Sequence, residues 1–177
     1  ASDVYKRQIT TGEGGMVVSN SSEIINRVAY LKNQSVSLDK EYWHDEVGYN
    51  FRMTNICAAI GLGQLEQIDK ILSKKKKIET WYKENLQDTC IHLQETQKYG
   101  TNSHWMVTAR TENSNQCAVI REYLKNNGIE TRPIFVPMHI MPSHFRRESY
   151  PVAEHLGKCG FNLPSFPALK EEEVKYI

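Results

Sequence analysis

Hydrophobic residues in the first third of the chain follow first a strand-like and then a helical pattern. Residues 16–19, with the sequence MVVS, form a β-rich run, and apolar side chains from residue 22 onward share one helical face. Ser21 or Ser22 stands where an N-cap is needed. The face consists of Ile24, Ile25, Val28 and Leu31. The pattern predicts a strand over 16–19, a turn and a helix.

A long helix is predicted after an irregular loop. The segment SVSLDKEYWHDEVGYNFRMT has no sustained period, which is typical of a loop that is functional or covered by a partner. Residues 55–87 then form the longest helical pattern, with Thr54 or Asn55 as its N-cap. Gly61 and Gly63 weaken its middle by about 1 kcal/mol each relative to alanine. We therefore expect one helix with a kink or a close contact at these glycines.

The rest of the chain alternates strand and helix patterns. Strand patterns cover residues 103–110 and 131–139. Helix patterns begin at residues 115, 150 and 170, and the first two end at Gly128 and Gly160. This order predicts a small mixed sheet with helices on one side.

Composition excludes several classes of partner. The chain has 177 residues and a net charge of +1, which gives no general attraction to nucleic acid or an anionic membrane. No apolar run approaches the roughly 20 residues of a membrane-spanning helix. Four widely spaced cysteines without a CxxC pair predict reduced thiols in the cytoplasm and no metal site. The KKKK run at 74–77 fits a solvated helix face better than a nucleic-acid site.

Two segments offer groups for ligand binding, and the second of them suits an oxyanion. The sequence TTGEGG, residues 10–15, brings bare backbone amides, although a tight turn before a strand explains it equally well. Asn50 and Arg52 are two positions apart and present an amide and a guanidinium on the same side of an extended segment. That pair suits a phosphate just before a helix. The alternative is a surface ion pair beside a capped turn.

A third segment, residues 131–139, holds Arg132 and His139 around an apolar strand punctuated by prolines. Prolines fix the backbone and would hold either side chain at the rim of a pocket. A single histidine is more often structural than functional, so both interpretations stay open. The other histidines show no spacing typical of a metal site or a catalytic triad.

Taken in order, four segments resemble the DegT/DnrJ/StrS family of nucleotide-sugar aminotransferases, and most closely its perosamine-synthase branch. They are ITTGEGGMVVSN, VGYNFRMTNICAAIGLGQLEQID, GIETRPIFVPMH and YPVAEHLGKCGFNLPSFPAL. The resemblance implies an α/β, aspartate-aminotransferase-like fold, which is fold type I of the enzymes that use pyridoxal 5'-phosphate (PLP). It implies that residues 9–77 end the PLP-binding large domain and form a connecting helix. Residues 78–177 would be a small α/β domain, truncated at its end.

The resemblance places the family's Schiff-base lysine two positions before Ile9, where this chain has Arg7. Lys6 lies one residue too early, and a guanidinium is not the amine nucleophile that an imine requires. The residues ASDVY do not match the family's approach to the lysine, and DVYKRQ resembles a translated transposon end, so we interpret residues 1–8 as a non-native scar. We expect the chain as given to be an inactive C-terminal fragment.

Other family motifs carry over residue by residue. Asn50 and Arg52 match the segment that reaches the cofactor phosphate of the other subunit in a homodimer. Glu13 and Gly14 match the loop that lines the cofactor cleft. These four residues are the candidates for cofactor binding.

Arg132 and His139 match the small-domain strand that faces the sugar nucleotide. The resemblance implies transfer of an amino group, with glutamate as donor, to a 4-keto or 3-keto deoxysugar on a nucleotide, for polysaccharide or glycoside synthesis. The alternatives are a PLP-dependent sugar dehydratase of the same family and a non-catalytic module that reuses the small domain. We expect residues from about 78 onward to be the more autonomous part, since the preceding apolar faces need a partner.

Overall fold

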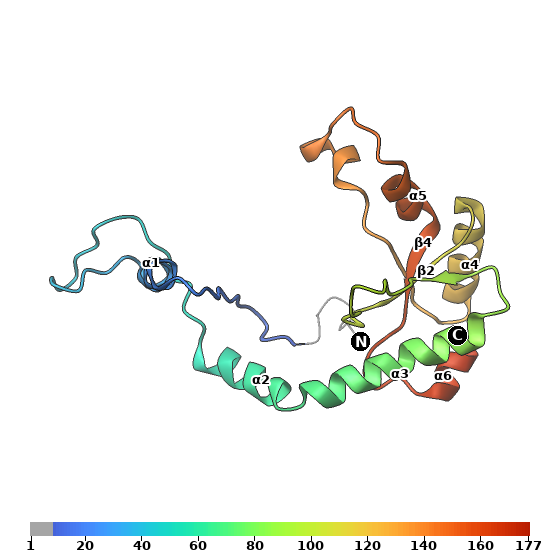
Figure 1. Cartoon of the computed structure of the whole chain (residues 1–177), viewed down its shortest axis with the longest axis horizontal. Helices are drawn as coiled ribbons and strands as arrows, with labels where there is room; N and C mark the ends of the chain where they lie inside the picture. The colour runs from blue at the N-terminus through green and yellow to red at the C-terminus, as the bar shows by residue number, and fades with distance from the viewer. Residues whose placement is uncertain (1–8) are drawn as a thin grey trace. The chain divides into compact units, whose positions relative to one another are not determined.

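The computed structural model describes residues 9–177 and divides them into two compact units. The first is Ile9–Gln67, and the second is Ile68–Ile177 (Figure 1). This division falls before the domain division predicted at residue 77, because the next helix packs with the C-terminal unit. The Schiff-base position, Arg7, and the neighbouring Lys6 lie outside the described residues.

The first unit begins with an extended segment that leads into helix α1 (Ser22–Lys32). Ser21 is its N-cap, and the Ser21 hydroxyl accepts from the amide of Ile24 at 3.4 Å, as predicted. The strand predicted for residues 16–19 is wrong. A strand needs a neighbour for its backbone groups, and this exposed segment pairs with no other among the residues the structure describes.

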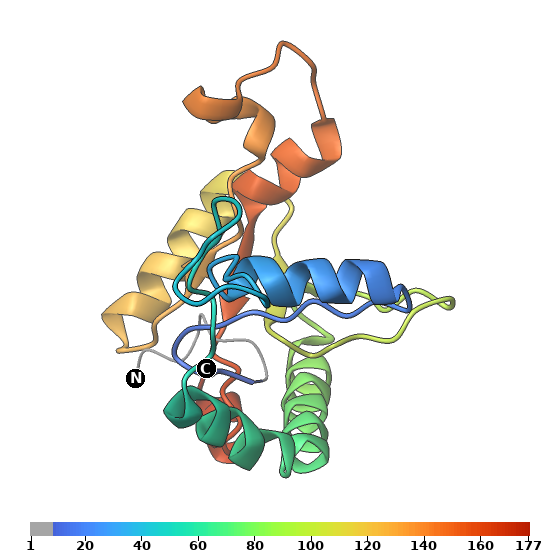
Figure 2. The same cartoon turned by 90° about the vertical axis from the view of Figure 1, so that its left-hand side faces the viewer.

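The loop after α1 is irregular, as predicted, and is tied to that helix (Figure 2). Arg27 makes a bidentate contact with Glu46, and the Tyr30 hydroxyl donates to Asp45 at 3.1 Å. The backbone amide of Tyr49 donates to the carbonyl of Leu31 at 2.8 Å. These bonds hold the loop against α1, so that the end of the loop near Asn50 lies beside the end of the helix.

The segment predicted as one long helix forms two helices, so the prediction of a single continuous helix is wrong. Helix α2 (Asn55–Leu65) begins at the N-cap Thr54, and helix α3 (Ile68–Leu86) follows after Glu66 and Gln67. The amide of Gln67 donates to the carbonyl three residues back, which tightens the last turn of α2 and ends it. The break therefore lies beyond the two glycines.

The second unit contains a four-stranded sheet in the order β1-β2-β4-β3. All three strand pairs are antiparallel, so the expected mixed sheet is wrong. The strands are β1 (His92–Leu93), β2 (Val107–Arg110), β3 (Arg132–Pro133) and β4 (Gly160–Leu163). Strands β2 and β3 fall inside the two predicted strand segments, whereas β1 and β4 were not predicted.

The helices of the second unit lie where the sequence predicts them. They are α4 (Ser114–Asn126), α5 (Pro151–Cys159) and α6 (Glu171–Tyr176), with short 3-10 turns η2 (Met138–Ile140) and η3 (Pro142–His144). Gly128 follows α4 with a φ of 77°, a left-handed conformation that favours glycine at a helix end. Local capping signals therefore predict these helices well.

The hydrophobic core of the described residues lies in the second unit. Helices α3, α4 and α6 cover one face of the sheet, with Ile78 and Tyr82 of α3 fully buried against it. The sheet contributes Val107, Ala109, Phe161 and Leu163. Helices α1 and α2 contain no buried residue. Burial of apolar area drives folding, so this contrast supports the expectation that the C-terminal part is the more autonomous, which stays a prediction.

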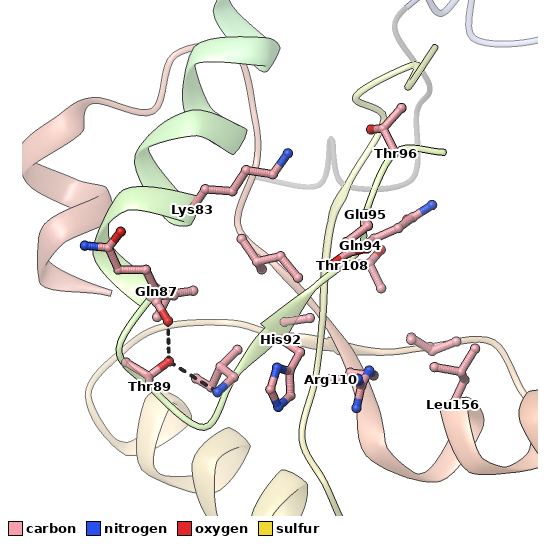
Figure 3. A pocket seen from close by; sticks show the side chains of 15 residues that line it. Lys83, Gln87, Thr89, His92, Gln94, Glu95, Thr96, Thr108, Arg110 and Leu156 are labelled. Carbon is pink, nitrogen blue, oxygen red and sulfur yellow. Dashed lines mark hydrogen bonds between the residues drawn. The ribbon is translucent and has the colours of Figure 1, made fainter. Parts of the chain in front are cut away.

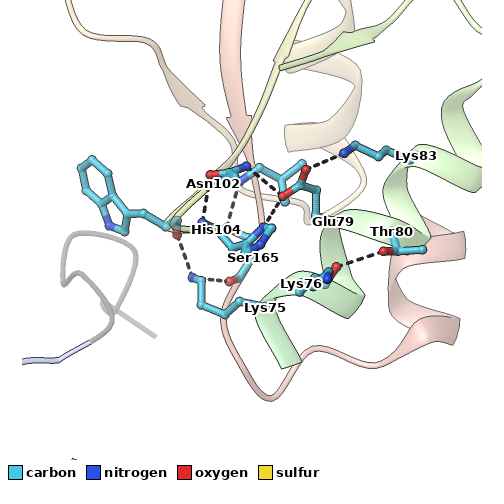
Figure 4. Close-up of polar contacts among 10 residues, drawn as sticks. Lys75, Lys76, Glu79, Thr80, Lys83, Asn102, His104 and Ser165 are labelled. Atoms are coloured by element: carbon cyan, nitrogen blue, oxygen red, sulfur yellow. Dashed lines mark hydrogen bonds and ion pairs between the residues drawn. The ribbon is translucent and has the colours of Figure 1, made fainter. Parts of the chain in front are cut away.

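Lys75 is an exception within the KKKK run. Lys74, Lys76 and Lys77 are exposed, as a solvated helix face requires, but Lys75 is 8% exposed. Figure 4 shows its ammonium group pointing to the carbonyl of Ser165. The prediction of a solvated face is therefore wrong for Lys75, because two backbone carbonyls replace the water around its charge.

Candidate functional site

The glycine loop, residues 10–15, adopts backbone conformations that require glycine. Gly12 has a φ of 82° and Gly14 a φ of 139°, both closed to most other residues. The Thr11 hydroxyl donates to the carbonyl of Glu13 at 2.6 Å and closes the turn. A Cβ atom added at Gly14 would lie 2.7 Å from Cε of Met53. The loop is therefore a packed turn against residue 53.

Helix α2 holds the start of this loop. The side-chain amide of Gln64 accepts from the amide of Thr10 at 3.0 Å and donates back to the carbonyl of Thr10. One turn earlier, a Cβ added at Gly61 would lie 2.8 Å from the Thr11 methyl group. Gly61 thus makes the close contact predicted for this helix. The sequence analysis did not identify Gln64. Its position three residues after Gly61, on the same helical face, was the feature that could have indicated a shared contact.

Asn50 and Arg52 lie on the segment that runs from the end of the loop into α2. Both are exposed, and Asn50 pairs through its backbone with Asn33. The rings of Tyr49 and Phe51 stack with centroids 5.2 Å apart, at alternate positions of this extended segment. Because side chains alternate along an extended backbone, Asn50 and Arg52 share the opposite side, as predicted.

Two of the three candidate segments therefore meet in the first unit. Gly14 contacts Met53, which is next to Arg52, and the Thr54 hydroxyl accepts from the amide of Cys57 to start α2. The structure thus brings the glycine loop next to the segment that carries Asn50 and Arg52. By the same alternation Met53 lies on the side of Tyr49 and Phe51, so the loop meets that side, whereas the exposed Asn50 amide and Arg52 guanidinium suit an anion on the other side.

Arg132 and His139 lie in the second unit and make separate contacts. Arg132, on β3 opposite Asn162, pairs with Glu130 at 3.2 Å. His139, in η2, lies 3.0 Å from the Glu154 carboxylate. Its ring also meets the ring of Tyr150 edge-on, with centroids 4.9 Å apart.

Glu154 organises the surroundings of His139. It accepts from the amide of Tyr150 at 2.9 Å and from the Ser149 hydroxyl at 3.2 Å. The hydrogen bonds from the Tyr150 amide and from His139 lower the pKa of Glu154. The carboxylate therefore holds His139 at the start of α5. This contact fits a structural role for His139, which is one of the two roles considered for it.

A groove of about 1100 Å³ is lined by residues of β1 and β2 together with neighbouring residues of α3 and α5 (Figure 3). His92 and Arg110, which are cross-strand partners, line it together with Lys83 of α3. The six candidate residues from the sequence do not line this groove. The glycine loop and the Asn50 segment carry the sequence motifs, and we place the candidate site with them.

Two negative findings concern the described residues alone. Across residues 9–177, the structure brings together no three His, Cys, Asp or Glu side chains in a group that could hold a metal ion. In the same stretch, every helix is too short or too polar to cross a membrane.

Solved structures identify the fold. The aminotransferase PseC of Helicobacter pylori, involved in the biosynthesis of pseudoaminic acid, superposes with a TM-score of 0.86 at 22% identity. The superposition covers 96% of this chain and 48% of PseC. The fold is therefore that of the fold type I, PLP-dependent sugar aminotransferases, as the sequence predicted.

Sequence comparisons identify the family. The model of the DegT/DnrJ/EryC1/StrS aminotransferase family matches residues 5–177, so this chain belongs to that family. The GDP-perosamine synthase of Escherichia coli O157:H7 is 45% identical over 97% of this chain and 47% of its own length. A putative pyridoxal phosphate-dependent aminotransferase of Bacillus subtilis is 32% identical over 93% of the chain and 44% of its own length. The chain thus spans about half the length of these relatives.

Proposed function

We propose that this chain is part of a PLP-dependent aminotransferase that aminates a nucleotide-linked keto-deoxysugar, with glutamate as the amino donor. The observation that carries the proposal is the meeting of the glycine loop with the Asn50 segment at Gly14 and Met53. Family membership supports the reaction class, and the 45% identity to a GDP-perosamine synthase supports a nucleotide sugar as substrate.

The residues present fit a PLP phosphate. Asn50 and Arg52 offer an amide and a guanidinium, which together match a phosphate dianion, and both are exposed where a second subunit would meet them in a homodimer. Glu13 and Gly14 would line the cleft beside the cofactor. When bound, PLP supplies the electron sink for moving the amino group.

The second unit would hold the substrate. The planar guanidinium of Arg132 suits the diphosphate of a nucleotide sugar, because a fork of N–H donors matches phosphate oxygens. His139, fixed by Glu154, would donate to or accept from a sugar hydroxyl from a constant position. The reaction would take place in the cytoplasm, where the four cysteines stay reduced.

The chain as given would not catalyse this reaction, because Arg7 stands at the Schiff-base position. Mixed with PLP, it should give no absorbance band that depends on Lys6. A band that is lost on Lys6→Ala would contradict this expectation. The alternatives remain a dehydratase of the same family and a non-catalytic module.

A joined enzyme tests the proposal. We define it as the N-terminal half of the E. coli O157:H7 relative, including its lysine, fused ahead of Ile9. It should aminate a nucleotide-linked 4-keto deoxysugar at the expense of glutamate, and an alanine at that lysine is the control. A folded joined enzyme that binds PLP but leaves keto sugars unchanged would overturn the proposal. Loss of water from the sugar without amination would favour the dehydratase.

A further inference from the structure

Gln64 of α2 makes side-chain hydrogen bonds to a residue that lies far away along the chain. Its Oε1 accepts from the amide of Thr10 at 3.0 Å, and its Nε2 donates to the carbonyl of the same residue, 54 positions earlier. The side chain thus pairs with the backbone of Thr10 as a neighbouring strand would. Both donor and acceptor groups of Thr10 are satisfied by one amide.

The orientation of this amide is fixed by its surroundings. Nε2 also donates to the carbonyl of Ile60 at 3.1 Å, so its two hydrogens face two carbonyl oxygens. Turning the amide over would place Oε1 against both oxygens and leave the Thr10 amide without its acceptor. The contact between Gly61 and the Thr11 methyl group holds the next residue of the loop against the same helix.

The position of Thr10 gives this contact a chemical meaning. Thr10 is the third residue after position 7, where the family has its Schiff-base lysine, so little chain separates the two. In an enzyme that carries the family's lysine at that position, fixing both backbone groups of Thr10 would limit where the lysine side chain can begin. Small displacements of a reacting group lower rates strongly, because reactions need close alignment.

We propose that Gln64 is a positioning residue, which sets the place of the Schiff-base lysine by clamping the backbone of Thr10 to α2. The inference rests on the proposed function for its catalytic consequence, whereas the clamp itself is a property of this chain. Gln64 touches neither substrate nor cofactor in this role. It acts through the backbone that leads out of the lysine position.

A matched control lies three residues further along. Gln67, which follows the end of α2, also donates to the carbonyl four residues back, that of Gly63 at 3.2 Å, and is exposed. Gln64→Leu and Gln67→Leu therefore each remove one bond to the carbonyl four residues back, with the same change of side chain. They differ in the bonds to Thr10.

The first experiment measures the clamp in the chain of 177 residues by NMR. In Gln64→Leu, the hydrogen-exchange protection of the Thr10 amide should fall about tenfold, and Gln67→Leu should leave it unchanged. In Gln64→Glu, the Thr10 carbonyl resonance should titrate with the introduced carboxyl, because only the protonated acid donates to it. Equal Thr10 protection in the wild type and Gln64→Leu would overturn the inference.

The second experiment measures the role in the joined enzyme. Gln64→Leu should lower kcat at least tenfold while KM for the sugar nucleotide changes little, and it should shift the pH at which the cofactor absorbance changes. Gln67→Leu should match the wild type in both. An active joined enzyme in which Gln64→Leu keeps full kcat would overturn the positioning role and leave the proposed function intact. An inactive joined enzyme would instead count against the proposed function, and the first experiment would still decide the clamp.

Discussion

Lys75 and Ser165 are joined by a buried hydrogen bond across 90 positions of the chain. The ammonium group of Lys75 donates to the Ser165 carbonyl at 2.9 Å and to the Trp105 carbonyl at 2.7 Å. Burial lowers the pKa of Lys75, because the charged form loses water. One lysine of α3 thus ties together the segment before β2 and the segment after β4.

Replacing this lysine should weaken the second unit. Lys75→Met keeps the aliphatic stem but leaves two carbonyls without their donor, so we expect the free energy of unfolding to fall by about 2 kcal/mol. Lys76→Met, at the exposed neighbouring position, should change it by less than about 0.5 kcal/mol. Chemical denaturation followed by circular dichroism compares the two, and equal midpoints would show that the buried ammonium contributes nothing.

Glu79 should make the same unit sensitive to acid. Burial raises the pKa of this carboxyl, but hydrogen bonds from Lys83 and His104 lower it by more, and its pKa lies below the ordinary value of 4.5. The carboxylate therefore stabilises the fold above pH 4.5, and this contribution is lost as the pH falls through the lowered pKa.

Glu79→Gln tests this acid sensitivity. Its free energy of unfolding should be lower than that of the wild type at about pH 7, and the difference should shrink toward about pH 3. Glu112→Gln, at an exposed position, is the control and should follow the wild type throughout. A constant difference across this range would mean that the charge of Glu79 is not the cause.

The two glycines of α2 should respond differently to alanine. Gly63 has open space where a Cβ would lie, so Gly63→Ala should stabilise the helix by about 1 kcal/mol. Gly61→Ala gains the same propensity, but its Cβ would lie 2.8 Å from the Thr11 methyl group, and we expect no net gain. Hydrogen exchange in α2 measures both. A Gly61→Ala variant as stable as Gly63→Ala would show that Thr11 moves aside freely.

Arg52 should contribute to cofactor affinity in the joined enzyme. Loss of a charge-assisted hydrogen bond to phosphate should raise the dissociation constant of PLP at least tenfold in Arg52→Ala. Lys32→Ala removes one positive charge from an exposed position of the same unit and should have little effect. Equal weakening in both variants, removed by salt, would indicate only a general attraction.

Helices were predictable from the sequence where capping signals are local. Ser21 caps α1 through its own hydroxyl, and Gly128 ends α4 by its left-handed backbone. Strand β4 was missed because all four of its residues are buried and it follows α5 directly, without alternation or a turn. Its existence depends on pairing with β2 and β3, which come from distant parts of the chain.

The candidate site stays a prediction, and the contacts around it were only partly predictable. The glycine loop and Asn50 were identified from motifs, but the sequence does not show that Gln64 reaches Thr10 across 54 positions. Likewise, a run of lysines does not reveal that one of them is buried against Ser165. The roles of such residues depend on contacts with distant parts of the folded chain. The residues next to them in the sequence carry little information about these contacts.

The place of β4 in the sheet also constrains when the second unit can assemble. Gly160–Leu163 joins the edge strand β3 to the pair formed by β1 and β2, so the earlier strands have no shared neighbour until these residues have been made. Proteins begin to fold during synthesis, domain by domain from the N-terminus. While a ribosome is making this chain, helices α3 and α4 therefore leave the exit tunnel with their apolar faces uncovered, and the core closes only after Gly160–Leu163 has been made.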